Sequence, residues 1–585
     1  MLPEEIPIDF KRLEVKLLLT SLGSNSKSGP PVSGAGTAEE LVGLIENAQY
    51  QEVLRSDTAS TLLPLPSSFG GSSQDDVASA AKKYYDKVRS ALSSYLSSAE
   101  STTDKADRHL QALAVGVAAL YIFLQTNFTG PPMRDVVGAP YELRGAPRGP
   151  NMDDWAMQEL AADGEDPIGR YRLPQYLLTA RILLVEPRLP HTKDRQAALQ
   201  ATSQSALSTA RQEGGLLHKW PLTGAWWAAR TLAWQQRLLS RRSPTLRVGL
   251  LRLFSQILQG LASEDAPIAV GLGVEAGLGR QVHVAALLEA ALMEYMYDCV
   301  DAGEATLKEA LKVAGVEFKL SGVLGKRTEH QVESKAQLVL TVERAPAGEE
   351  AGGWESDEEE MVRKDAAAVE AAPQDAPAVE APAPSPAAET DSGDSAPVVE
   401  GEQPVRREGT GENKLAEFGI KDESNVIEAG PRLDSAEGAT TLRSLEQALV
   451  LAHCTSIKRS SADDELQGWE MAPYVDAVRS QRCTRPLFSV VCNLLQARFE
   501  KARGRTRERA LLRMEALVEE VQGASLETAA AAQRMRYAFS VWLPPWLSLR
   551  KEWGEMLLSF GFVGPAMSLF EGGCAVANRR MRDDK

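Results

Sequence analysis

The stretch Leu110–Leu124 reads LQALAVGVAALYIFL and is the strongest apolar run in the chain. It covers fifteen residues between His109 and Gln125. A helix needs roughly 20 residues to cross a bilayer, so this run is too short. Its large side chains repeat at three- and four-residue spacing, which places them on one helical face. They are Leu113, Val117, Leu120, Tyr121 and Leu124. The stretch therefore predicts a buried core helix that ends before Gly130-Pro131-Pro132.

The same helical spacing recurs along most of the 585 residues. Aromatic residues make up 6% of the chain, Ala and Leu are abundant, and strictly alternating β-branched runs are scarce, which favours helices over strands. We therefore expect an all-α protein. The expected helices span residues 11–22, 37–45, 75–96, 110–124, 155–160, 174–185, 226–238, 244–258, 282–297, 304–314, 444–453, 471–479, 486–499, 506–521, 528–542, 546–560 and 565–570.

Two helix pairs are similar to single units of a tetratricopeptide-type (TPR-type) repeat. The pair at residues 282–314 is joined at Asp301-Ala302-Gly303 and has small Ala residues where its helices would cross. A second pair at residues 546–570 hinges at Gly561 to Gly564. No sustained 34-residue period connects the two pairs. The sequence thus predicts an irregular, TPR-like helical-repeat solenoid.

A long acidic linker is expected to interrupt this solenoid. Residues 348–402 carry sixteen acidic side chains against Arg363 and Lys364, so they hold −14 of the formal net charge of −16. A segment of Ala, Pro, Glu, Asp and Ser buries too little apolar surface to order itself, which predicts disorder. We therefore divide the chain into a helical region at 1–346, a linker at 347–412 and a second helical region at 413–585.

The segment Leu320–Thr328 comes closest to a nucleotide-binding loop. Such a loop reads G-x-x-x-x-G-K-[ST], because backbone amides cradle the phosphates and the final hydroxyl binds magnesium. Here Leu320 replaces the first Gly and Arg327 replaces the hydroxyl residue. We interpret the segment as a turn between helices, in which Lys326 and Arg327 meet carbonyls or carboxylates.

No cofactor, metal site or catalytic group is predicted. The six histidines do not pair at metal-ligand spacing, and the five cysteines are scattered without a C-x-x-C pair. Residues 1–10 lack the cationic start and apolar core of a signal peptide. We expect reduced thiols, no membrane association, and a location in the cytoplasm, the nucleus or both.

Three further features are candidates for interaction. Trp226 and Trp227 are adjacent and read either as packing residues or as part of a protein-binding motif. Ser356 precedes four acidic residues and is a candidate phosphorylation site. The run 498–513 holds seven basic residues. An alternative function is therefore that of an RNA-associated factor that uses this run as a basic helix. Interleaved Glu side chains and the lack of an aromatic platform favour a solvated helix face instead.

Several stretches together resemble the tetratricopeptide repeat protein 27 family. They occur in the family's order and span roughly residues 110–570. They are Gly116–Pro132, Ala180–Val185, Trp226-Trp227 with Arg230, Arg242-Ser243-Pro244, Leu320–Thr328, Arg507–Ala510 and Leu543-Pro544-Pro545. The resemblance implies an all-α, non-catalytic protein of the cytosol or nucleus. It also implies links to chaperone systems and to the maturation of ribonucleoprotein complexes.

The leading functional hypothesis is a non-catalytic helical scaffold that binds other proteins, with chaperone machinery among the candidate partners. We expect protein partners rather than nucleic acid or membranes. The family's main repeat array follows the position matching Phe570, so the resemblance covers its amino-terminal half. A truncated gene model, a splice form and a genuine short protein are the alternatives. If the array is missing, Leu557, Leu558, Met567, Leu569 and Phe570 should form an exposed apolar face.

Limited proteolysis tests the expected organisation. Cleavage should fall between Gly348 and Glu402, because an unstructured acidic segment offers no protection to the backbone. The two helical fragments should then co-elute on a sizing column, because they are expected to share one solenoid. Separate elution of the two fragments would show that the segment is a tether between independent domains.

Overall fold

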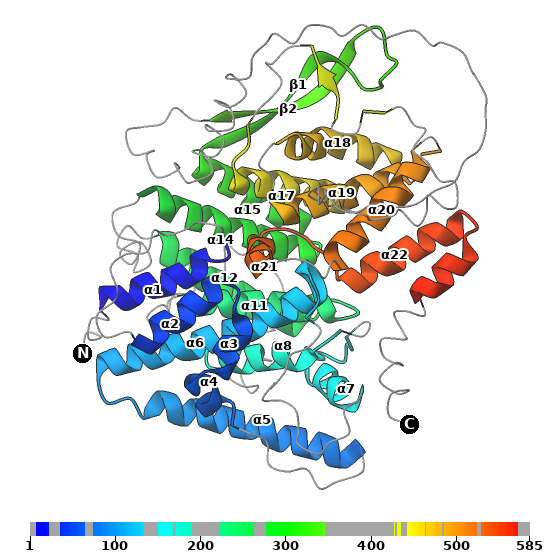
Figure 1. Cartoon of the computed structure of the whole chain (residues 1–585). Coiled ribbons are helices and arrows are strands. Elements are labelled where there is room, and N and C mark those ends of the chain that lie inside the picture. Colours follow the sequence, from blue (N-terminus) through cyan, green and yellow to red (C-terminus); the bar gives the residue numbers. More distant parts are fainter. Residues whose placement is uncertain are drawn as a thin grey trace, which may run out of the picture.

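The computed structural model places a helical body beneath a β-hairpin (Figure 1). The description below covers residues 7–22, 36–64, 74–133, 150–167, 171–189, 223–262, 276–344, 426–427, 430–434, 441–462, 464–481, 485–501, 503–504, 506–522 and 528–570. The acidic linker at 347–412 and Ser356 lie outside these residues.

The first helices of the chain pack around α6 (Thr102–Leu124), which contacts each of the five helices before it as well as α8. These helices are α1 (Ile8–Leu19), α2 (Gly36–Glu46), α3 (Tyr50–Arg55), α4 (Asp57–Leu62), α5 (Gln74–Ser97), α7 (Pro150–Glu159) and α8 (Pro174–Ala180). Both α6 and α8 continue into a π-helical turn, at Gln125–Thr129 and Arg181–Val185.

Helix α6 contains the apolar run that predicts a core helix. Among the described residues, 102–129 form the one stretch long and apolar enough to cross a membrane. All residues in its most apolar window are buried inside the protein, as in the core helix of a globular domain. Its apolar side chains face neighbouring helices on every side, because α6 lies at the centre of the amino-terminal region.

The remaining helices stack one on the next, as in a helical-repeat solenoid (Figure 1). In order along the chain they are α11 (Gly224–Leu238), α12 (Pro244–Ala262), α14 (Ala276–Met296), α15 (Val300–Ala314), α17 (Ser444–Ser460), α18 (Glu465–Arg479), α19 (Pro486–Glu500), α20 (Arg507–Gln522), α21 (Thr528–Met535) and α22 (Trp546–Ser559). Residues 563–570 add a final helical segment. The predicted all-α, TPR-like fold is confirmed.

The helix pair α14 and α15 packs closely, as expected of a TPR-like unit. A Cβ atom at Gly303 would lie 2.5 Å from the Tyr295 ring, so a small residue is required where the helices meet. The junction between them differs from the prediction. Helix α15 already begins at Val300, and the chain turns at Asp298, whose φ is 56°.

An antiparallel sheet interrupts the helices, and it corrects the interpretation of Leu320–Thr328 as a turn between helices. Gly315 ends α15 in the left-handed conformation, and β1 (Val316–Lys326) follows. It pairs with β2 (Lys335–Arg344) and with the short β3 (Arg432–Leu433), in the order β2-β1-β3. The signal that was missed is the alternation of Phe318, Leu320 and Leu324, which is typical of a strand.

The helices before and after the acidic stretch pack against each other. Helix α17 lies against both α14 and α15. Helix α21 ends at Met535 rather than continuing to Trp542, because Tyr537 adopts a positive φ of 62°. At this break the Tyr537 amide donates to the Ser21 carbonyl at 2.7 Å. The Trp546 indole likewise donates to the Thr126 carbonyl at 3.1 Å.

The expected apolar face near residue 570 is only partly present. Leu557 is buried and packs in the core, so this part of the expectation is wrong. Leu558 and Met567 are exposed, at 42% and 47%. The face is narrower than predicted because α22 packs Leu557 toward α20 and the core.

Candidate functional site

Trp226 and Trp227 lie in the core and are fully buried. The Trp226 indole donates to Glu289 Oε2 at 2.7 Å. Arg230, one turn further along α11, makes two hydrogen bonds to the same carboxylate, at 2.6 and 3.0 Å. Glu289 lies on α14, so this buried ion pair joins α11 to α14.

Aromatic rings surround the Arg230 guanidinium. Its Cζ lies 5.2 Å from the ring centroid of Trp226, 4.7 Å from Trp227 and 4.2 Å from Phe539. Phe539 comes from the region beyond the acidic stretch, and both it and Trp227 contact Tyr121 of α6. The tryptophan pair therefore anchors the junction of α6, α11, α14 and the carboxyl-terminal region, and its rings are not presented to a partner.

Lys326 and Arg327 lie at the end of β1 farthest from α15. Lys326 pairs with Arg432 of β3 in the sheet. Arg327 follows it and extends to α18, where its Nη2 atom binds Asp476 at 2.9 Å. The expectation that a basic side chain here meets a carboxylate is confirmed for Arg327. The geometry is that of a strand end held against a helix.

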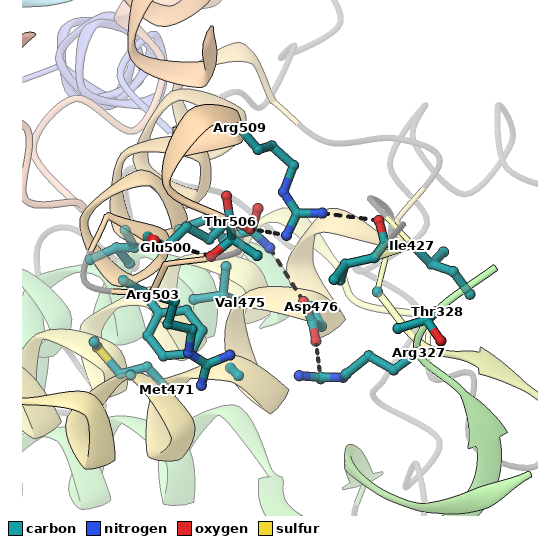
Figure 2. Close-up of a pocket in the computed structure, with 17 residues that line it drawn as sticks. Arg327, Thr328, Ile427, Met471, Val475, Asp476, Glu500, Arg503, Thr506 and Arg509 are labelled. Carbon is teal, nitrogen blue, oxygen red and sulfur yellow. Dashed lines mark hydrogen bonds and ion pairs between the residues drawn. The ribbon is translucent and has the colours of Figure 1, made fainter. Parts of the chain in front are cut away.

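A cavity of about 210 Å³ opens beside this ion pair (Figure 2). The end of β1, the segment Val426–Ile427, α18, α19 and the start of α20 all contribute to its wall. Most of its surface is apolar. The apolar side chains are Val426, Ile427, Met471, Ala472, Val475, Leu495 and Phe499.

Charged groups ring the cavity in fixed pairs. Arg509 binds Glu500 at 2.6 Å and the Val426 carbonyl at 2.9 Å, which holds that segment against α20 (Figure 2). Arg503 lies 3.9 Å above the Phe499 ring and 5.6 Å from the Trp469 ring, and its Nε atom is 3.3 Å from Glu465. Charged and apolar side chains thus line one concave site.

Burial shifts the pKa of two groups in this wall. Burial raises the pKa of Asp476 above its ordinary value, although Arg327 and Arg479 pull it in the opposite direction. Burial also lowers the pKa of Arg503, and the nearby Arg327 charge lowers it further, while Glu465 opposes both effects. Both guanidinium groups line the same cavity.

The basic run at 498–513 does not form a single basic helix. Helix α19 ends at Glu500, α20 begins at Arg507, and Ala502 and Arg505 lie outside the described residues. Arg498 makes a bidentate pair with Glu552 at 2.9 Å, and Arg507 donates to the Ser559 carbonyl at 2.8 Å. Intramolecular partners therefore hold these side chains, and the sequence could not show those partners because they lie far along the chain.

Within the described part of the chain, no group of three or more His, Cys, Asp or Glu side chains is placed to hold a metal ion. The site offers shape, apolar contact and paired charge, which are the elements of a binding site.

Two curated proteins are similar to this chain over most of its length. The chain is 21% identical over 506 residues to the tetratricopeptide repeat protein 27 homolog of Dictyostelium discoideum, covering 84% of this chain and 48% of that protein. The resemblance to the tetratricopeptide repeat protein 27 family is confirmed. A TPR repeat-containing protein of Schizosaccharomyces pombe is 23% identical over 497 residues, covering 79% of this chain and 50% of its own.

The chain thus spans about half the length of the curated relatives it matches. No family model matches the sequence. No solved structure matches it either.

The sequence interpretation missed most of the cavity wall. Asp476 and Arg327 are 149 residues apart, and no local pattern links them. The basic run contained Arg503 and Arg509, but its spacing did not reveal that Arg509 turns inward to Glu500. Leu466 and Trp469 are three residues apart, so a helix over this segment places them on one face, but only the structure shows that they are exposed.

Replacing Glu289 with Ala tests the buried ion pair. The change leaves the Arg230 charge buried without its carboxylate, so unfolding free energy should fall by about 3–5 kcal/mol. Urea denaturation followed by circular dichroism measures the loss. The paired change Glu289→Leu with Arg230→Met removes both charges and should recover most of it. A single Glu289→Ala variant as stable as the parent would contradict the assigned role.

The pH dependence of stability tests the environment of Asp476. A pKa raised by folding means that Asp476 contributes stability below its unfolded pKa and loses it as pH rises through the folded pKa. Asp476→Asn removes this titration. The unfolding free energy of Asp476→Asn relative to the parent should therefore increase as pH rises through that interval. A difference that is constant with pH would show that burial does not control the group.

Proposed function

We propose that the chain is a non-catalytic scaffold that binds other proteins at the face around the cavity. The stacked helices and the similarity to two TPR-containing proteins support a protein-interaction role in general. The observation that carries the choice of face is the exposure of Leu466 and Trp469 on α18, at 61% and 54%. Both lie in the turn of α18 that leads into the cavity wall at Gly468 and Met471.

Trp469 and Arg503 form the pair of residue types that dominates binding at protein interfaces. Tryptophan and arginine contribute large contact areas, and truncating them is costly when the surrounding surface becomes dry. Here the Arg503 guanidinium lies within 5.6 Å of the Trp469 ring centroid and 3.9 Å of the Phe499 ring centroid, so the pair is held in place before a partner arrives. Such preorganisation reduces the entropy cost of association.

The finer role that we propose is assembly of protein or ribonucleoprotein complexes together with chaperone machinery, in the cytoplasm, the nucleus or both. The family resemblance supports this role. A scaffold of this kind needs a face that accepts a partner without chemistry, and the cavity provides apolar contact and fixed charges.

Affinity capture from a native lysate, with quantitative mass spectrometry, tests the proposed function. The full chain should enrich a reproducible set of proteins. The double change Leu466→Ser with Trp469→Ala should reduce the enrichment of those proteins at least fivefold. The matched control is Ile8→Ser with Met567→Ser, which removes apolar side chains of comparable exposure, 44% and 47%, from other faces. An equal loss in the control, or no enrichment by the parent, would contradict the proposal.

A further inference from the structure

We propose that the cavity binds an acidic peptide segment of a partner protein, with one large apolar side chain in the cavity and flanking carboxylates on Arg327 and Arg503. This inference rests on the proposed function and specifies the chemistry of the partner.

The cavity has the shape of a side-chain pocket. Its volume of about 210 Å³ accommodates one large aliphatic or aromatic side chain, and Met471, Val475 and Leu495 supply an apolar floor. One wall is fixed by close packing. A Cβ atom at Gly468 would lie 1.7 Å from the Phe499 ring, so the ring lies directly against the backbone of α18 at this glycine.

The charges around the pocket are unbalanced toward positive. Three guanidinium groups and two carboxylates line the pocket, an excess of one positive charge. The guanidinium groups belong to Arg327, Arg503 and Arg509, and the carboxylates to Asp476 and Glu500. A negatively charged ligand would relieve this imbalance.

Two of the three lining arginines are placed to meet a ligand. Arg509 is buried on Glu500, with 9% of its side chain exposed. Arg327 and Arg503 keep 38% and 27% exposed at the pocket rim. The Arg327 Nε atom is buried and donates to no acceptor among the described residues. A carboxylate at the rim would pair with these two groups and lessen their mutual repulsion.

The pocket favours a peptide over a nucleic acid. Single-stranded nucleic acids bind proteins through free aromatic faces on which bases stack. Here the Phe499 ring already contacts the Arg503 guanidinium, whose carbon lies 3.9 Å from the ring centroid, and it packs closely against Gly468. An aliphatic side chain in the cavity would contact Met471 and Leu495, which line it.

Fluorescence anisotropy with the full chain and a labelled synthetic peptide tests this inference. The probe is a ten-residue peptide of Glu and Asp around a single Leu. It should bind the parent, and replacing its Leu with Ser should weaken binding at least tenfold. The double change Arg327→Gln with Arg503→Gln should weaken binding of the Leu peptide at least tenfold. Ala472→Phe, which fills the cavity, should abolish binding.

The matched control is Arg12→Gln with Arg55→Gln, which removes two exposed, ion-paired arginines from the amino-terminal helices. It should leave binding unchanged, and thermal melting of every variant verifies folding. Binding that is absent, insensitive to the Leu, or equally weakened in the control would overturn the inference. So would tighter binding of a peptide of residues 352–362, because the chain's own acidic segment would then be the occupant.

The two proposals can fail separately. Lysate partners that depend on Leu466 and Trp469, together with no peptide binding, would leave the scaffold function and overturn the peptide chemistry. Peptide binding that depends on Arg327 and Arg503, without any captured partner, would leave the peptide chemistry of the cavity and overturn the scaffold function.

Discussion

The buried ion pair between Arg230 and Glu289 is the interaction on which the arrangement of the helices depends. Two charges removed from water must satisfy each other, and their geometry tolerates little displacement. Glu289 also accepts the Trp226 indole, and Phe539 closes the remaining side of the guanidinium. Residues from both sides of the acidic stretch therefore meet at one point. This requirement explains how a chain with a long acidic insertion builds a single core.

The cavity depends on the same closure. Once the carboxyl-terminal region is held by Phe539 and the Trp546–Thr126 hydrogen bond, α18, α19 and α20 continue the stack that begins with α14 and α15. The hairpin then reaches from the end of α15 to α18, where Arg327 meets Asp476. The face around the cavity thus combines residues from both sides of the insertion, so neither half of the chain forms it alone.

Sequence reasoning predicted the helices well, because period-3.6 patterns such as those of α6 and α14 are local. It missed the hairpin because Gly325 and Lys326 match the end of a phosphate-loop pattern, while the alternation of Phe318, Leu320 and Leu324 is a strand signal. It also could not predict the cavity, since Arg327 and Asp476 meet only after the solenoid closes. The sequence allowed the tryptophan pair to be either packing residues or a binding motif. Its burial beside Arg230 shows that the two rings pack in the core.

Hydrogen exchange on the full chain carrying Phe539→Ala is the most direct test of this shared core. Amide protection reports the local free energy of opening. If Phe539 closes the Arg230–Glu289 junction, protection should fall in α11 and α14, which lie far from residue 539 in the sequence. Loss of protection confined to residues 528–545 would contradict a common core and would mean that the two helical regions are stabilised independently.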